Sequence, residues 1–152
     1  MIAANRDIIL LNKRYDKASR RDMYRATKIS GVSYHHGYQS TKDSGYHKRV
    51  EMYKIRIPLD AQVQGSRTYL PEAYYDALDD AEVGNHWSLH TEDMIIVCLP
   101  ETDVPDTALD EKQVKELTAS VGAERKIIHI VDYADNTLRG SDTVKHWRIG
   151  GA

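Results

Sequence analysis

The stretch that decides the fold runs from residue 86 to residue 99 and reads His-Trp-Ser-Leu-His-Thr-Glu-Asp-Met-Ile-Ile-Val-Cys-Leu. Its last part, residues 94–99, is the longest apolar run of the chain, and a short run with β-branched residues at its centre is typical of a buried strand. The polar residues 90–93 before it predict a tight turn. Residues 87–89 alternate in polarity, as the preceding strand of a hairpin would. We therefore expect the core to be built around this hairpin.

Short apolar or alternating runs recur along the rest of the chain. Residues 50–58 form the clearest amphipathic strand, because Tyr53, Ile55 and Ile57 share one side. Gly31 lies inside another run and is typical of a β-bulge. Short strands separated by polar turns predict a mainly β protein, either a small β-barrel or a sandwich. The further strands are expected at residues 8–11, 23–27, 28–34, 127–131 and 144–149.

Two short helices are expected between the strands. Pro71 is a residue typical of helix starts, and residues 71–79 continue in a helical pattern with an early acidic residue. Asp110 and Gln113 can cap a second helix near residues 108–120. No repeat, linker or low-complexity break divides the sequence, so we expect one domain.

The size and composition of the chain limit its class. At 152 residues, the single domain 1–152 can bury a core without a disulfide. Cys98 is the sole cysteine and lies in the apolar run, which favours a structural buried thiol in a reducing compartment. Arg6 and Asp7 interrupt the N-terminal apolar stretch and argue against a signal peptide. No apolar run approaches the ~20 residues of a membrane span, so no membrane contact is expected.

Charge is distributed unevenly, although the net charge is only −2. Residues 1–56 carry 13 Lys or Arg against 5 Asp or Glu, whereas residues 57–123 carry 3 against 14. This polarity indicates either two solvated faces or a subunit whose basic side meets nucleic acid or the acidic side of a neighbour. The ten tyrosines, in a chain without phenylalanine, suit contact surfaces that become dry on assembly.

Residues 35–49, which precede the alternating strand at residues 50–58, lack aliphatic side chains and are rich in Gly, Ser, His and Lys. They cannot contribute much to a core, so we expect a long exposed loop or a hairpin. Three histidines are present, but Cys and acidic partners at metal-ligand spacing are missing. Tyrosines interleaved with basic residues can contact nucleic acid. The candidate DNA-facing residues are His35, His36, Tyr38, Lys42, Tyr46, His47, Lys48 and Arg49.

Signals for catalysis are weak. The sequence has no zinc-protease, nucleophile-elbow, phosphate-loop or dinucleotide-binding motif. His86 and His90 would lie ~13 Å apart in a strand, too far to share one metal ion. Asp93 is either a catalytic carboxylate at a strand end or, more commonly, a residue that hydrogen-bonds the backbone of its own turn. We expect no enzymatic activity, no metal and no cofactor.

A set of short motifs follows one another along most of the chain. They are NKRYD (12–16), TKISGVSY (27–34), YKIRIP (53–58), YLPE (69–72), WSL (87–89) with DMIIV (93–97), and RGS (139–141) with HWRIGG (146–151). In this order they resemble a family of small proteins encoded among the head and neck genes of tailed bacteriophages of Gram-positive hosts.

Within that family, a small barrel with a long loop and a short inserted helix is similar to the head-closure, or stopper, proteins of long-tailed, siphophage-type phages. The resemblance implies a homo-oligomeric ring of six or twelve copies in the neck of the virion, made in the host cytoplasm. Its neighbours would be a portal or adaptor protein on the head side and a tail-terminator or tail-tube protein on the tail side. The loop 35–49 would be a gate that contacts packaged double-stranded DNA without sequence preference.

The sequence departs from the smaller stopper proteins in carrying an extra helix near residues 106–119. It leaves a tail-terminator or a minor head protein of the same particle as alternatives. A free-standing small β-barrel that binds nucleic acid is the alternative from another class, favoured by the positive charge of residues 1–56.

Overall fold

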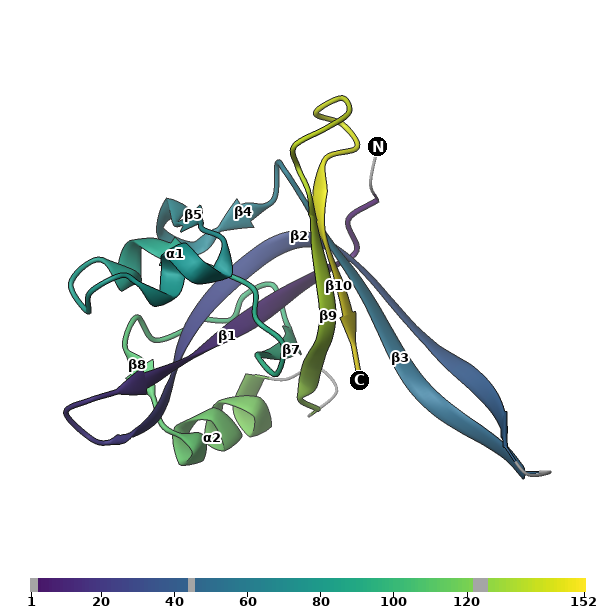
Figure 1. The fold of residues 1–152 in the computed structure, drawn as a ribbon, viewed down its shortest axis with the longest axis horizontal. Helices are drawn as coiled ribbons and strands as arrows, with labels where there is room; N and C mark the ends of the chain where they lie inside the picture. The colour runs from purple at the N-terminus through teal and green to yellow at the C-terminus, as the bar shows by residue number, and fades with distance from the viewer. Residues whose placement is uncertain (1–2, 44–45, 122–125) are drawn as a thin grey trace.

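Six strands of the computed structural model form a closed β-barrel in the order β1-β7-β9-β10-β3-β2, closed by pairing of β2 with β1 (Figure 1). The structure describes residues 3–43, 46–121 and 126–152, without the side chains of residues 39–43 and 46–49. The prediction of a mainly β, barrel-like protein with short helices is confirmed. The barrel strands are β1 (Arg6–Asp16), β2 (Arg21–Asp43), β3 (Tyr46–Pro58), β7 (Met94–Cys98), β9 (Ile128–Asn136) and β10 (His146–Gly151).

Strand β2 is continuous where two strands were predicted, at residues 23–27 and 28–34. It pairs with β1 from Asp16↔Arg21 to Arg6↔Val32, and the register shifts between Arg6 and Asp7. Gly31 lies opposite this shift with a φ of 83°. Glycine adopts this backbone conformation without a Cβ clash, so the strand bulges here and continues. The predicted bulge at Gly31 is confirmed.

The core has two parts, one on each side of β1 and β7. Ile8 and Leu10 of β1 point into the barrel with Ile95 and Val97 of β7. Their outward-facing neighbours are also buried, beneath α2 (Glu111–Val121) and the short strand β8 (Ala108–Leu109). Burial on both faces explains why these two strands are the continuous apolar runs of the sequence.

Helix α2 begins with a reciprocal cap. The backbone N–H of Gln113 donates to Asp110 Oδ1 at 2.8 Å, and the backbone N–H of Asp110 donates to Gln113 Oε1 at 2.9 Å. These bonds satisfy two backbone donors at the helix start, as the sequence predicted. Val114 is buried, and Leu117 and Val121 pack against the same outer core.

The predicted hairpin over residues 86–99 is wrong. Strand β6 (His86–Trp87) pairs in parallel with β5 (Thr68–Tyr69), whereas β7 pairs with β1 and β9. The ring of Trp87 packs 4.9 Å from both Tyr69 and Trp147, centroid to centroid. A short alternating run indicates a half-buried strand but does not identify its partner, and here the aromatic contacts decide it.

Helix α1 (Glu72–Asp76) follows Pro71 and is shorter than the predicted 71–79. Its anchor is Tyr75, which is fully buried. Arg14 of β1 donates through Nη1 to the Tyr75 carbonyl at 3.2 Å and through Nη2 to the Leu78 carbonyl. The guanidinium thus holds the end of α1 against the barrel. The remaining short elements are β4 (Gln62–Val63), η1 (Gln64–Ser66) and η2 (Val83–Asn85).

Strands β2 and β3 continue beyond the barrel as a two-stranded hairpin, which points away from the side that carries α1 (Figure 1). The pairing of β1 with β2 ends at Val32, and that of β10 with β3 ends at Tyr53. The two arms pair with each other as far as Asp43↔Tyr46. Over its described backbone, the stretch 35–49 is therefore a hairpin and not an open loop. Pairing between the two strands satisfies their backbone polar groups without an apolar core, so a sequence of mostly polar residues can form this hairpin.

Within the described ranges, no helix is long and apolar enough to cross a membrane.

Candidate functional site

The root of the β2–β3 hairpin carries a cluster of aromatic and charged side chains. The His36 ring stacks on Tyr53 with 4.6 Å between centroids and 10° between planes. Glu51 places Oε1 3.6 Å from His36 Nε2, and its Oε2 accepts hydrogen bonds from the Tyr53 hydroxyl and from Lys126 Nζ. Lys126 Nζ also lies 4.8 Å from the centroid of Tyr53. These contacts fix the root of the hairpin to the segment before β9.

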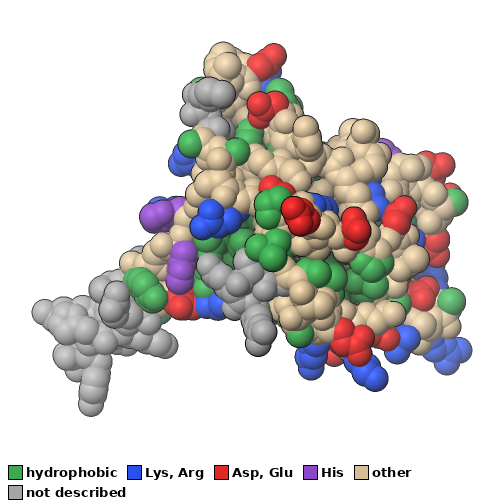
Figure 2. All heavy atoms as spheres, turned by 180° about the vertical axis from the view of Figure 1, so that it is seen from behind, with side chains coloured by type: hydrophobic (Ala, Val, Ile, Leu, Met, Phe, Trp, Pro, Cys, Tyr) green, Lys and Arg blue, Asp and Glu red, His purple; other side chains and the backbone are tan. Residues whose placement is uncertain are grey.

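The predicted DNA-facing residues are distributed over both arms of this hairpin. His35 is exposed, Tyr38 is 56% exposed, and His36 is partly buried by its stack. The backbone register places Lys42 opposite His47 and Lys48 opposite Thr41. Figure 2 shows His, Lys and Arg side chains gathered around the root of the hairpin. The side chains of Lys42, Tyr46, His47, Lys48 and Arg49 lie outside the described part of the structure.

A second cluster lies beside α1 and is centred on the buried carboxylate of Asp93. Its Oδ1 accepts the backbone N–H of Lys13 at 3.0 Å, and its Oδ2 accepts the Asn12 side-chain amide at 2.8 Å. The same Oδ2 lies 3.0 Å from Nδ1 of His90. Asn12 also donates to the Ser88 carbonyl at 2.7 Å. Asp93 therefore joins β1 to the segment between β6 and β7, in place of the bonds within its own turn that the sequence favoured.

His90 lies between two carboxylates. Its Nε2 is 2.8 Å from Asp76 Oδ1, opposite the contact of Nδ1 with Asp93. Burial alone would lower the pKa of His90, but the hydrogen bonds and charges of Asp93 and then Asp76 outweigh it and raise this pKa to about 9. At neutral pH the ring is an imidazolium with both nitrogens donating. It has no free nitrogen to act as a general base in this arrangement.

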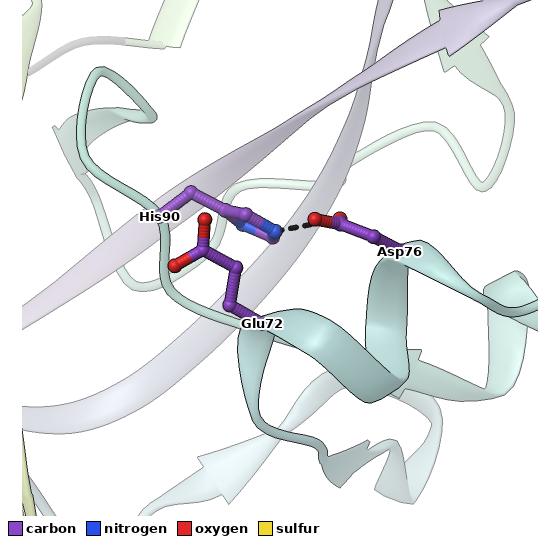
Figure 3. Close-up of side chains that lie close together, drawn as sticks. All are labelled: Glu72, Asp76 and His90. Atoms are coloured by element: carbon purple, nitrogen blue, oxygen red, sulfur yellow. Dashed lines mark hydrogen bonds and ion pairs between the residues drawn. The ribbon is translucent and has the colours of Figure 1, made fainter.

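Two carboxylates of α1 point toward this imidazole. Glu72 and Asp76 are four residues apart, so they share one face of the helix (Figure 3). Glu72 Oε2 accepts a hydrogen bond from the hydroxyl of Tyr133 on β9 at 2.7 Å. Burial and this contact with Glu72 raise the pKa of the Tyr133 phenol. A groove of about 740 Å³ opens over these groups, lined by Glu72, Asp76, His90 and Asp93 among others.

Sequence reasoning missed this cluster. It considered His90 with His86, but His86 contacts the Thr68 carbonyl instead, at 3.2 Å. The partners of His90 are Asp93, close by in the sequence, and Asp76, which belongs to a separate helix. The available signal was the spacing of Glu72 and Asp76 in a helix predicted at residues 71–79, which places both carboxylates on one face.

The fold and these two clusters define a small closed β-barrel protein with a projecting hairpin and an ionic cluster beside an inserted helix. The chain belongs to the family of unknown function DUF6751, which it matches over residues 2–152. No curated protein and no solved structure gives a significant match.

Proposed function

We propose that the chain is a structural component of the neck of a tailed bacteriophage, most similar to a head-closure ring. In this role it joins the portal or adaptor protein to the tail and helps to retain packaged DNA. Six or twelve copies would form the ring. The observation that carries the proposal is the β2–β3 hairpin, whose described backbone projects beyond the closed barrel (Figure 1).

A two-stranded ribbon is marginally stable by itself, and its open edges favour pairing with another chain. The arms beyond Val32 and Tyr53 have such edges, because neither β1 nor β10 reaches them. Residues 33–56 carry five Lys or Arg against two Asp or Glu. Positive side chains contact the phosphates of any duplex without regard to sequence. A hairpin of this composition suits the lumen of a DNA-conducting ring.

The opposite side of the molecule supports assembly in a ring. The segment of α1 and η2 carries the acidic residues Glu72, Asp76, Asp79, Asp80 and Glu82. It lies on the side of the barrel away from the hairpin (Figure 1). A ring of identical subunits needs two different, complementary surfaces on each copy. Basic and acidic sides on one subunit meet that requirement electrostatically.

The test is to shorten the hairpin in the phage that encodes the chain. Replacing residues 39–46 with a two-residue turn removes its far end and leaves the root cluster of His36 and Tyr53 in place. We expect filled heads that lose their DNA, measured as nuclease-sensitive DNA in purified particles. The matched control shortens the connection between β9 and β10, residues 137–145, and should retain DNA. Unchanged DNA retention after the hairpin deletion would contradict the gate.

Exposed Tyr38, in a hairpin region where Lys and Arg outnumber Asp and Glu, favours a second function, direct nucleic-acid binding by the free subunit. That function requires the purified monomer to bind double-stranded DNA at low salt, with affinity falling steeply as salt rises. A neck subunit acts only within its assembly, so no binding by the monomer supports the neck proposal. A position at the tail end of the neck or within the head would instead favour the tail-terminator or minor head alternatives.

A further inference from the structure

Three potential metal ligands converge beside α1, from two separate segments. Glu72 and Asp76 offer carboxylate oxygens and His90 offers Nε2, and these atoms all lie within 4.8 Å of one another (Figure 3). Metal–oxygen and metal–nitrogen bonds of about 2.1 Å place two ligands of a tetrahedral ion about 3.4 Å apart. Both carboxylates are exposed, so their side chains have room to rotate toward that distance.

The histidine is held as metal-binding histidines usually are. The second ring nitrogen of such a residue commonly donates to a carboxylate, which fixes the tautomer and the direction of the ring. Here Asp93 fills that place at 3.0 Å from Nδ1, and it is itself buried and held by Asn12 and by the backbone of Lys13. Nε2 consequently points at Asp76. Glu72 has an outer partner too, the Tyr133 hydroxyl.

The charges around the imidazole also favour a cation. Three carboxylates, those of Glu72, Asp76 and Asp93, surround one histidine. Among the ion pairs of the described residues, neither Glu72 nor Asp76 pairs with a lysine or an arginine. Arg14 and Lys13, which line the same groove, pair instead with Asp80 and Asp22. Three carboxylates against the single charge of the His90 imidazolium therefore leave a net negative charge at the cluster, and neither Lys13 nor Arg14 pairs with Glu72 or Asp76 in the described structure.

We propose that Glu72, Asp76 and His90 bind one divalent transition-metal ion, with Asp93 as the residue that positions His90. The ion takes the place of the proton on His90 Nε2, which is released to solvent. One imidazole and two carboxylates suit Zn²⁺ or Mn²⁺, whereas Mg²⁺ and Ca²⁺ prefer oxygen ligands alone. The remaining coordination positions face the groove and are open to water. A bound ion joins α1 to the segment before β7. This assignment does not depend on the neck function.

The test is calorimetric titration of the full chain, freed of metal with EDTA, with ZnCl₂ and with MnCl₂. We expect one equivalent of Zn²⁺ to bind. Glu72→Gln and Asp76→Asn should each weaken that binding at least tenfold, because each removes a charged ligand. The matched control is Asp80→Asn, which changes an exposed carboxylate lining the same groove and should bind as the wild type does. His86→Gln, which alters a neighbouring imidazole, should also leave binding unchanged.

Two results would overturn the proposal. If Glu72→Gln, Asp76→Asn and the wild type bind Zn²⁺ with equal affinity, the bound metal is an adventitious ion only, held by other histidines. Absence of saturable binding to the folded wild type excludes the site directly. The two carboxylate variants change exposed residues, so circular dichroism should show them folded. The second readout is the ¹⁵N resonance of His90 Nε2, which is assigned as the imidazole signal that disappears in His90→Gln. Zn²⁺ should shift this resonance in the wild type.

Discussion

Asp93 Oδ2 lies 3.0 Å from Nδ1 of His90, and both side chains are buried at the point where β1, β7 and α1 meet. The pair connects parts of the chain that are far apart in sequence, since Asp93 also binds Asn12 and the backbone of Lys13. His90 extends the connection to Asp76 of α1. The stability of this side of the barrel depends on a carboxylate and an imidazolium being present together.

Removing the carboxylate should be costly. Asp93→Ala removes the acceptor of the Lys13 N–H, one of the two acceptors of the Asn12 amide and the buried one of the two carboxylates that contact the His90 imidazolium. Breaking a buried ion pair by removing one partner costs about 3–5 kcal/mol. We expect a loss of that size in the free energy of unfolding, measured by urea denaturation. Asp142→Ala is the control, because the Asp142 side chain is 82% exposed in its pair with Lys145, and such pairs contribute about 0–1 kcal/mol. Equal losses in the two variants would contradict this role of Asp93.

The metal-free protein should lose stability as the solution becomes alkaline. The pKa of His90 is raised from 6.5 to about 9 in the fold, so the folded state binds the proton more tightly than the unfolded state. The stabilisation is therefore complete below about pH 6.5 and is lost as pH rises through about 9. It amounts to roughly 3 kcal/mol by linkage. The difference in unfolding free energy between wild type and His90→Gln, measured in EDTA from pH 6 to 9.5, should fall over this range. A constant difference would show that His90 is not charged in the fold.

Two adjacent glycines of β10 should respond differently to alanine. A Cβ at Gly151 would lie 2.5 Å from Ile128 Cγ2 and 3.1 Å from the His129 carbonyl, within a paired and buried part of the barrel. Overpacking of this kind costs about 1–3 kcal/mol. At Gly150 the close atom is Asp132 Oδ1, the end of an exposed side chain that can rotate away. Thermal unfolding should show Gly151→Ala clearly destabilised and Gly150→Ala within about 0.5 kcal/mol of wild type. The reverse order would contradict the packing of β10 against β9.

Cys98 should be unreactive while the protein is folded. It is 3% exposed in the outer core, and burial raises the pKa of its thiol, so little reactive thiolate is present or accessible. Ellman's reagent should label the native protein only at the rate of unfolding, and label it at once in guanidinium. Fast labelling of the native protein would contradict the burial of Cys98 in the outer core.

The sequence predicts those parts of the fold that are determined by residues close together in the chain. The runs Ile8–Leu11 and Met94–Cys98 are apolar because both faces of β1 and β7 are buried, and the sequence identifies both strands. The cap of α2 involves residues three apart and is likewise predicted. The parallel pairing of β6 with β5 is set by contacts among Trp87, Tyr69 and Trp147, which no local pattern contains.

The candidate sites show the same division. The hairpin at residues 35–49 is visible in composition, because it lacks the residues that build a core. The cluster of Asp76, His90 and Asp93 depends on β1, α1 and the start of β7 meeting in space. Spacing can place Glu72 and Asp76 on one helix face, but only the fold shows that this face meets an imidazole.

The central claim is that this chain is a neck protein, and cryo-electron microscopy of the head-to-tail junction of the phage that encodes it tests that claim most directly. We predict a ring of this barrel between the portal assembly and the tail, with the β2–β3 hairpins lining the lumen around the DNA path. Density for the chain elsewhere in the particle, or a mature particle without it, would contradict the claim and favour direct nucleic-acid binding by the free subunit.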